Sequence, residues 1–297
     1  MVGKNLLEHP KSKEYNFIAP SRKDLDLLDP HAVGAFISKE SPKFVIHAAG
    51  HVGGIQANMK NPQDYLLKNL NMSLNVIVAA DNYDVKNFLN LGSSCMYPRH
   101  GFNPLKEETI LSGELEPTNE GYALAKIVAS RLCDYISSDD STKMFKTIIP
   151  CNLFGRYDKY DPKHSHMIPA VIRRLHYAKL RNKETVEVWG DGSARREFMS
   201  AGDLADFIFY AIENFVRMPQ VLNVGIGRDF TIKQYYEAIA SVVGYKGIFK
   251  YDISKPIGMK QKLVDNSRQK EFGWVNTKSL EEGIVEAYNF FINKEHL

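Results

Sequence analysis

Short apolar runs, rich in β-branched and aromatic residues, alternate with longer segments of helical periodicity through the first half of this chain. Apolar residues that recur every three to four positions indicate the buried face of a helix, and short apolar runs between turn residues indicate buried strands. Alternation of the two is typical of βαβ units, which build a parallel sheet covered by helices. The expected strands are Tyr15–Ala19, Phe44–Ala48, Phe88–Gly92 and Phe145–Pro150, and the expected helices are about Pro62–Asn82 and Asn119–Ser137.

Beyond residue 150 the pattern becomes less regular. Shorter strands are expected at Val186–Trp189, Val221–Val224 and Ile248–Tyr251, mixed with helices near Met167–Leu180, Gly202–Phe215, Ile232–Val243 and Leu280–Phe291. This change predicts an α/β chain with a doubly wound parallel sheet in residues 1–155 and a smaller lobe in residues 156–297. Some segments of the second part are expected to return to the sheet, and a ligand cleft is expected between the two parts.

Composition narrows the class of protein. The 297 residues are 44% hydrophobic and 25% charged, with a net charge of +3 and no block of lysines or arginines, so nucleic acid is a poor guess for a partner. No apolar run reaches transmembrane length and no signal-like N-terminus is present, so no membrane partner is expected. The three cysteines, Cys95, Cys133 and Cys151, lack metal-type spacing and fit a reducing cytoplasm.

The N-terminus departs from the pattern expected of a dinucleotide-binding sheet. A first strand and a glycine-rich turn should place pyrophosphate on a helix N-terminus, but Met1-Val2-Gly3 runs straight into a helix-like stretch, Lys4–His9. Tyr15–Ala19 then takes the place of the second strand. Arg22, just past its end, stands where a positive charge would meet the 2′-phosphate of NADP, although a solvated surface arginine is the alternative.

The most informative polar pattern is Tyr122-x-x-x-Lys126, which follows the expected strand end at Ser93. On a helix, residues four apart stand on the same face. An ammonium beside a phenol favours the ionised form and lowers a pKa that is ordinarily about 10, so the phenol can exchange a proton with a ketone or alcohol oxygen near neutral pH. With the Ser93 hydroxyl holding the same oxygen, the pattern predicts a carbonyl-reduction site. Such a pair also arises by chance in about half of chains this long.

Six stretches in the same order carry a resemblance to a known family. They are His51-Val52-Gly53-Gly54-Ile55, Leu91-Gly92-Ser93-Ser94-Cys95-Met96-Tyr97-Pro98, Glu116-Pro117-Thr118-Asn119-Glu120, Ser165-His166-Met167-Ile168-Pro169, Val188-Trp189-Gly190 with Arg196-Glu197-Phe198, and Lys262-Leu263-Val264-Asp265. From Met1 to about Phe291 the chain resembles the extended short-chain dehydrogenases/reductases, and within them the GDP-L-fucose synthases. The resemblance implies an NADP-binding Rossmann-type domain in residues 1–155 and a mainly sugar-nucleotide-binding lobe in residues 156–297.

The resemblance also implies an activity. Enzymes of that family epimerise C3 and C5 of GDP-4-keto-6-deoxy-D-mannose and reduce C4 with NADPH. Ser93, Tyr122 and Lys126 match the reduction triad, and Cys95 and His166 match the pair that moves protons during epimerisation. The residue types suit this chemistry, because a proton next to a ketone is acidified when the enolate oxygen is stabilised. The alternatives are that Cys95 is a small buried hydrophobe, as Cys133 and Cys151 are expected to be, and that His166 caps the following helix.

Binding residues and assembly are implied in the same way. Arg174, Trp189, Arg196 and Lys262 match substrate-binding positions, and paired arginines suit a diphosphate. A homodimer is implied, built from the helices near Pro62–Asn82 and Asn119–Ser137. The positions that match the NADP(H) site are Met1, Val2, Gly3, Arg22, Leu91, Gly92, Ser93, Tyr122, Lys126, Pro150, Asn152, Leu153 and His166, and no metal site is expected.

Two departures from the family pattern leave other activities open. The missing glycine-rich turn predicts weak NADPH binding if nothing precedes Met1, and an additional N-terminal segment would remove this expectation. Ile257 stands where the family has an acidic residue, which leaves the exact sugar open. One alternative is the reduction, with or without epimerisation, of a related GDP-4-keto sugar such as a heptose. Another is a non-catalytic sugar-nucleotide-binding relative that has lost its cofactor site.

Overall fold

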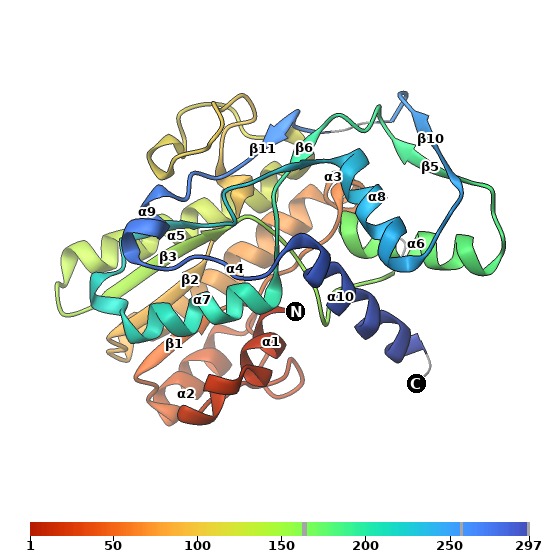
Figure 1. The fold of residues 1–297 in the computed structure, drawn as a ribbon. Coiled ribbons are helices and arrows are strands. Elements are labelled where there is room, and N and C mark those ends of the chain that lie inside the picture. Colours follow the sequence, from red (N-terminus) through yellow and green to blue (C-terminus); the bar gives the residue numbers. More distant parts are fainter. Residues whose placement is uncertain (162–164, 256–257, 296–297) are drawn as a thin grey trace.

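The computed structural model describes residues 1–161, 165–255 and 258–295, so Ile257 lies outside the described residues. Its central element is a four-stranded parallel sheet in the order β1-β2-β3-β8 (Figure 1). The strands are β1 (Phe44–His47), β2 (Asn87–Leu91), β3 (Met144–Pro150) and β8 (Val221–Val224). The α/β class and the parallel, doubly wound sheet expected from the sequence are therefore confirmed.

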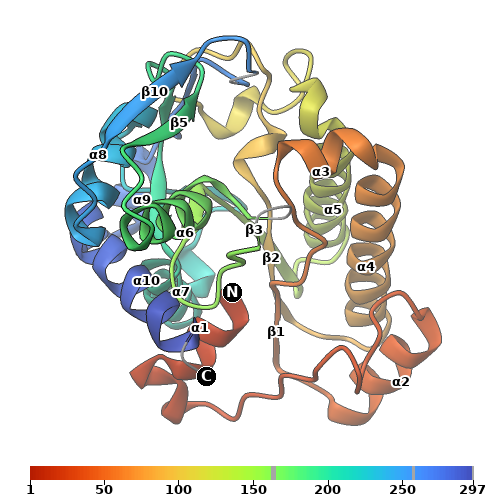
Figure 2. The same cartoon turned by 90° about the vertical axis from the view of Figure 1, so that its right-hand side faces the viewer.

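Helices cover both faces of this sheet, as the edge-on view in Figure 2 shows. Phe88 of β2 packs with residues from α2 (Pro30–Glu40), α4 (Pro62–Asn82) and α5 (Glu120–Asp139). Leu89, the next residue, points to the opposite face and packs with α7 (Ala201–Glu213) and with Leu6 of α1 (Val2–Glu8). This alternation along one strand is why a continuous apolar run is needed when both faces are buried.

The predicted strand at Tyr15–Ala19 is wrong, because the structure gives this segment no regular secondary structure. A strand needs a neighbour to complete its backbone hydrogen bonds, and no strand among the described residues pairs with this segment. Side chains hold it instead: the rings of Tyr15 and Phe17 lie 5.7 and 5.8 Å from the ring of Phe209 on α7.

The other predicted elements of the second half are confirmed, and several form a separate apolar core. The strands β5 (Thr185–Trp189) and β10 (Ile248–Asp252) pair in parallel, and residues from β5 pack with α6 (Met167–Leu180), α8 (Ile232–Val243) and α10 (Leu280–Glu295). The α8 helix begins with a capping box between Thr231 and Gln234 and ends at Gly244, whose φ of 76° suits glycine.

Short elements connect the two regions. The strands β4 (Asn152–Phe154) and β7 (Phe198–Ser200) pair with each other, and β6 (Arg195–Arg196) lies between β9 (Phe230–Thr231) and β11 (Gln261–Lys262). The remaining helices are α3 (Ile55–Lys60), α9 (Ser267–Phe272) and the 3₁₀ turns Pro10–Glu14, Ser94–Met96, Glu107–Thr109, Pro117–Asn119 and Phe215–Arg217.

The second half of the chain also contributes to the first sheet, through β8, which pairs with β3, and through α7, which covers one face. A domain boundary near residue 155 stays a prediction. Within the described part of the chain, no helix combines the length and the apolar character that crossing a membrane requires.

Candidate active site

The site begins where β2 ends. After Leu91 and Gly92 the chain enters the 3₁₀ turn Ser94–Met96, and the Ser93 side chain caps this turn by accepting a hydrogen bond from the Cys95 backbone N–H at 3.3 Å. There is little room for a side chain at Gly92, because a Cβ there would lie 3.1 Å from the Ile148 carbonyl oxygen on β3. The tight turn thus presents Ser93 and Cys95 together at the carboxyl edge of the sheet.

The α5 helix brings Tyr122 and Lys126 to the same place. Tyr122 forms a side-chain hydrogen bond with Ser93. The Lys126 ammonium donates to the Leu91 carbonyl oxygen at 2.7 Å and lies 5.9 Å from the centroid of the Tyr122 ring. The structure therefore brings together the Ser93, Tyr122 and Lys126 side chains that the sequence pattern selected.

The expected effect of Lys126 on the phenol is wrong for this arrangement. Burial raises the pKa of Tyr122 above its ordinary value, and the nearby Cys95 raises it further, while the hydrogen bond with Ser93 opposes both. The ammonium is itself buried, which lowers the pKa of Lys126 to about 8, and it points at a backbone carbonyl. Desolvation thus outweighs the neighbouring charge, and at neutral pH the phenol carries the proton that a ketone reduction needs.

Lys126 also provides a test of whether a nicotinamide cofactor fits. An ammonium carries three N–H donors, and among the described residues it donates to one acceptor, the Leu91 carbonyl. The two other donors suit the hydroxyl groups of the cofactor's ribose. At the opposite end of the expected cofactor site, the first turn of α1 has no side-chain cap and Gly3 has open space around its Cα. Both observations fit a dinucleotide.

The other residues expected at the cofactor site come from the start of α1, from the end of β3 and the segment after it, and, for Arg22, from the segment before α2. The Met1 amino group is close enough to Asp158 for the carboxylate to affect its pKa, which burial lowers overall. Val2 and Leu153 pack against the core, and Pro150 ends β3. The Asn152 amide donates to the Glu197 carbonyl oxygen at 2.8 Å. Arg22 is exposed and is near enough to His51 to contribute to the lowering of its pKa.

A second group of side chains surrounds Cys95. The Asn119 amide donates to the Cys95 Sγ at 3.1 Å, and the Lys262 ammonium donates to the same sulfur at 3.6 Å. His166 stands at the N-terminus of α6 but its side chain makes no capping hydrogen bond, which removes the capping alternative. Burial is the largest cause of the lowered pKa of His166, and the charges of Lys159 and Lys262 lower it further.

The two other cysteines, Cys133 and Cys151, are buried in the apolar cores, as expected.

The four residues matched to substrate binding separate into two places, and one of them, Lys262, belongs to the Cys95 group. Arg196 lies near the Cys95 group. Burial lowers the pKa of Arg196, and the nearby charges of Glu116 and Cys95 act in the opposite direction. Arg174 and Trp189 instead meet at Glu187 of β5. The Arg174 Nη1 donates to the Glu187 carbonyl oxygen at 2.8 Å, and the Trp189 Nε1 donates to the Glu187 carboxylate at 3.0 Å.

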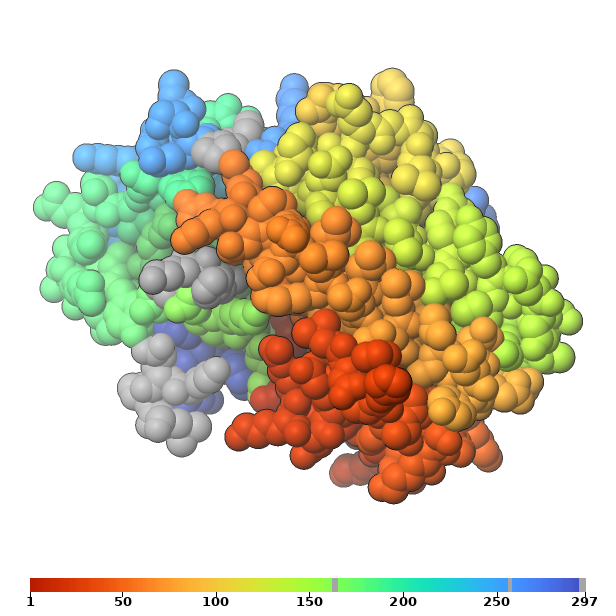
Figure 3. All heavy atoms as spheres, turned by 180° about the vertical axis from the view of Figure 1, so that it is seen from behind, coloured from red at the N-terminus to blue at the C-terminus, as the bar shows by residue number. Residues whose placement is uncertain are grey.

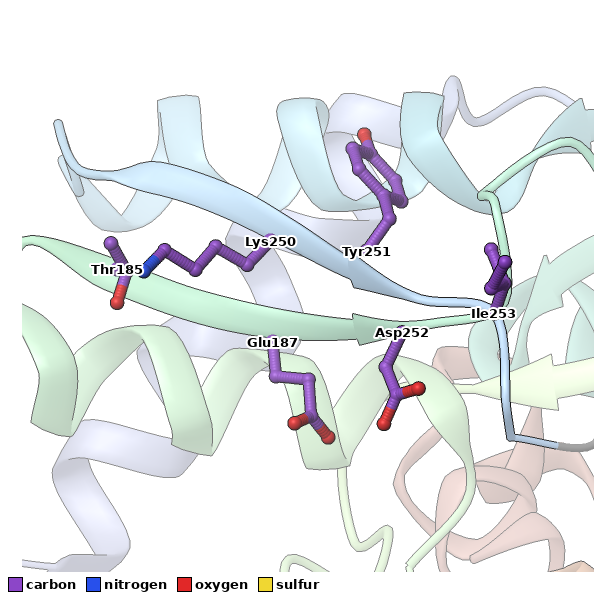
Figure 4. Close-up of a pocket in the computed structure, with 6 residues that line it drawn as sticks. All are labelled: Thr185, Glu187, Lys250, Tyr251, Asp252 and Ile253. Atoms are coloured by element: carbon purple, nitrogen blue, oxygen red, sulfur yellow. The ribbon is translucent and has the colours of Figure 1, made fainter.

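Sequence reasoning missed the pocket beside Glu187. It has a volume of about 450 Å³ and is lined by Thr185, Glu187, Lys250, Tyr251, Asp252 and Ile253. Figure 4 shows the Glu187 and Asp252 carboxylates on one side of the two-stranded sheet and Tyr251 on the other. The sequence did contain a pattern that could have predicted it: Thr185 and Glu187 are polar residues at alternate positions of β5, as expected when one face of a sheet is open to solvent.

The chain is similar to one protein family and to several known proteins. The NAD dependent epimerase/dehydratase family model matches residues 1–225. The GDP-L-colitose synthase of Yersinia pseudotuberculosis is 55% identical, over 100% of this chain and 96% of that protein. The GDP-L-fucose synthase of Azorhizobium caulinodans is 44% identical, over 98% and 93%. MlghC, the GDP-mannoheptose C4 reductase of Campylobacter jejuni solved with NADP bound, has a TM-score of 0.88 at 31% identity, over 98% of this chain and 95% of that chain.

The pKa of Lys126 predicts a pH-dependent change in stability. Between the folded value of about 8 and the ordinary value of 10.5, the unfolded chain holds a proton that the folded chain has released. The free energy of unfolding should therefore rise with pH across this window, by about 3 kcal/mol in total from this group. Lys126→Met should remove that rise, as urea unfolding between pH 7 and pH 10 would measure.

Lys86→Met is the matched control, because the Lys86 side chain is 45% exposed. The loss of a donor to the Leu91 carbonyl should cost Lys126→Met about 1–3 kcal/mol at every pH, so the slope is the informative quantity. Parallel stability curves for wild type and Lys126→Met would contradict the lowered pKa.

Proposed function

The chain belongs to the NAD dependent epimerase/dehydratase family, and we propose that it is an NADP(H)-dependent epimerase and reductase of a GDP-4-keto-6-deoxy sugar. The observation that carries the proposal is that two kinds of proton-transfer group lie together at the end of β2. Tyr122, bonded to Ser93, suits ketone reduction, and Cys95, in the same turn as Ser93, suits proton removal beside that ketone. The free thiols fit a cytoplasmic enzyme.

In the reduction step, the Ser93 and Tyr122 hydroxyls hold the C4 ketone oxygen. Tyr122 donates its proton to that oxygen, since its raised pKa keeps the phenol protonated at neutral pH. Lys126 and the first turn of α1 would hold NADPH, which supplies the hydride when it is bound. Arg22 would meet the 2′-phosphate that distinguishes NADPH from NADH.

In the epimerisation step, the same two hydroxyls stabilise the enolate oxygen. Cys95 takes the proton from the carbon next to the ketone, and the electron pair of the broken C–H bond passes to the enolate. His166 returns a proton to carbon and is reloaded from solvent, and Cys95 releases the proton that it took to solvent. The lowered pKa of His166 makes its protonated form a stronger acid for this transfer. Arg196 lies beside this group, and Arg174 and Trp189 would hold the nucleotide end near the pocket on β5 and β10.

Two sugars compete as the substrate. GDP-4-keto-6-deoxy-D-mannose, the precursor of GDP-L-fucose, fits the family resemblance. The higher identity to a GDP-L-colitose synthase, 55% against 44% for a GDP-L-fucose synthase, favours a second candidate. Colitose is fucose without the hydroxyl at C3, so the corresponding 4-keto substrate needs inversion at C5 alone.

A competition between these two 4-keto substrates in deuterated water, with NADPH, tests the proposal. The fucose-type product should carry deuterium at C3 and C5 because both positions invert. A preference of about tenfold or more in kcat/KM for the 3-deoxy substrate would assign the colitose type, since one lost or gained polar contact is worth roughly this factor. Cys95→Ser should take up less deuterium per turnover. Reduction of neither substrate would refute the proposed function. Reduction without deuterium uptake would indicate a reductase that does not epimerise its substrate, as in the heptose alternative.

Tyr122→Phe should slow the reduction of C4 by about a hundredfold or more while substrate binding is retained, because the ring stays and the proton donor is lost. The loss of NADPH absorbance measures the rate, and calorimetry with the GDP-sugar measures binding. Tyr83→Phe, at an exposed tyrosine just after α4, is the control. A Tyr122→Phe variant that reduces the substrate at the wild-type rate would show that the phenol is not the acid.

We also propose that the enzyme is a homodimer through α4 and α5. Figure 3 shows these helices, orange and yellow-green, side by side on an open face. The outward residues Leu67, Val78, Leu124, Val128 and Tyr135 are between 37% and 63% exposed. Their intervals of 11 residues on α4 and of 4 and 7 residues on α5 are close to whole numbers of helical turns, so they form an apolar stripe along each helix. Such a stripe on two adjacent helices is expected where the pair packs against a second copy.

Val128→Glu should convert the dimer to a monomer at micromolar concentration, because it would bury two unpaired carboxylates at a symmetric interface. Light scattering after size exclusion gives the mass. Val216→Glu, at an exposed valine in the turn Phe215–Arg217, is the matched control and should not change the mass. A monomeric wild type, or a dimeric Val128→Glu variant, would rule out this interface.

A further inference from the structure

Lys262 is a buried cation that forms no ion pair with a carboxylate of the described residues. Its residue is 8% exposed, and it lies at the end of the short strand β11. Among the described residues, no Asp or Glu comes within ion-pair distance of its ammonium, and the acceptor it contacts is the Cys95 sulfur at 3.6 Å. A buried charge is costly unless a group of opposite charge or a strong acceptor compensates it.

The other groups around Cys95 are donors or cations, except that the Glu116 carboxylate lies near Arg196. The Asn119 amide donates to the sulfur at 3.1 Å, and Arg196 is close enough to interact with Cys95 electrostatically. The neighbouring phenol of Tyr122 carries its proton, and His166, near Lys262, is an imidazole that cannot supply a negative charge. Glu116 can compensate the charge of Arg196, so the sulfur that Lys262 contacts is the group that can carry a negative charge beside this ammonium.

We infer that Lys262 is a positioning residue for the epimerisation step: its ammonium is the counter-ion that holds Cys95 as a thiolate, aimed by the Asn119 amide. This inference rests on the proposed function. The thiolate, and not the thiol, is the reactive form of cysteine, and a neighbouring cation favours it. When the thiolate removes the carbon-bound proton, an S–H bond forms, the C–H bond breaks, and its electron pair moves to the enolate oxygen.

The resemblance to a known family assigned Lys262 to substrate binding, and the two roles differ in what they predict. A residue that only binds substrate affects KM and leaves the free enzyme's thiol unchanged. A counter-ion of the thiolate affects the thiol before any substrate is present. Because Cys133 and Cys151 are buried and Cys95 is partly exposed, alkylation of the free enzyme reports on Cys95.

The test is the rate of alkylation by iodoacetamide, followed by mass spectrometry between pH 5 and pH 10 without substrate. The wild-type profile should have its midpoint at least about one pH unit below the value of about 8.5 expected of an ordinary cysteine. Lys262→Met should move the midpoint up by about one unit or more and slow alkylation at pH 7 about tenfold. Lys262→Arg, which keeps the charge, should restore most of the difference, and Cys95→Ser should abolish the reaction.

A second readout separates this inference from the proposed function. On the preferred 4-keto substrate, Lys262→Met should lose deuterium uptake more strongly than it loses hydride transfer. If no GDP-4-keto sugar is turned over, the proposed function fails, and the alkylation profiles still decide whether Lys262 controls the thiol. A wild-type midpoint at or above about 8.5 would overturn the inference even if Lys262→Met did not fold. An unchanged profile in a folded Lys262→Met variant with a raised KM would return Lys262 to substrate binding.

Discussion

One buried hydrogen bond fixes the relation between the helix and the strand that carry the proposed reduction groups. The Lys126 ammonium, on a residue that is 4% exposed, donates to the Leu91 carbonyl oxygen at 2.7 Å, at the last residue of β2. Since a buried ammonium needs an acceptor, α5 cannot slide along β2 without a large loss of free energy. Tyr122, one turn earlier on the same face, is thereby held against Ser93, two residues beyond Leu91.

Burial, more than neighbouring charge, sets the protonation states in this site. It is the largest cause of the raised pKa of Tyr122, of the lowered pKa of Lys126 and of the lowered pKa of His166. A protonated phenol suits the donation of a proton to a ketone, whereas an ionised one suits the oxidation of an alcohol. The electrostatics of the cluster therefore favour the reductive direction of the proposed reaction.

The α5 helix serves two purposes through its two faces. Tyr122 and Lys126 face the sheet, whereas Leu124 and Val128 face outward on the apolar stripe of the proposed dimer. The remaining proposed catalytic and positioning groups arrive from distant parts of the chain: His166 from the start of α6, and Lys262 from β11. The site is complete only when the second apolar core, built around α6, α8 and α10, is packed beside the sheet.

The sequence by itself determined the features that depend on local spacing. Apolar runs defined the strands that became β1, β2 and β3, and a four-residue interval put Tyr122 and Lys126 on one face of a helix. Tertiary structure decided the rest, because the outcome there depends on neighbours. Tyr15–Ala19 had the composition of a strand but found no strand to pair with. The pKa of Tyr122 rose because desolvation depends on what surrounds the whole helix. Lys262 contacts Cys95, which is 167 positions away in the sequence. No local pattern encodes this contact, because it forms only when two distant segments of the chain pack together.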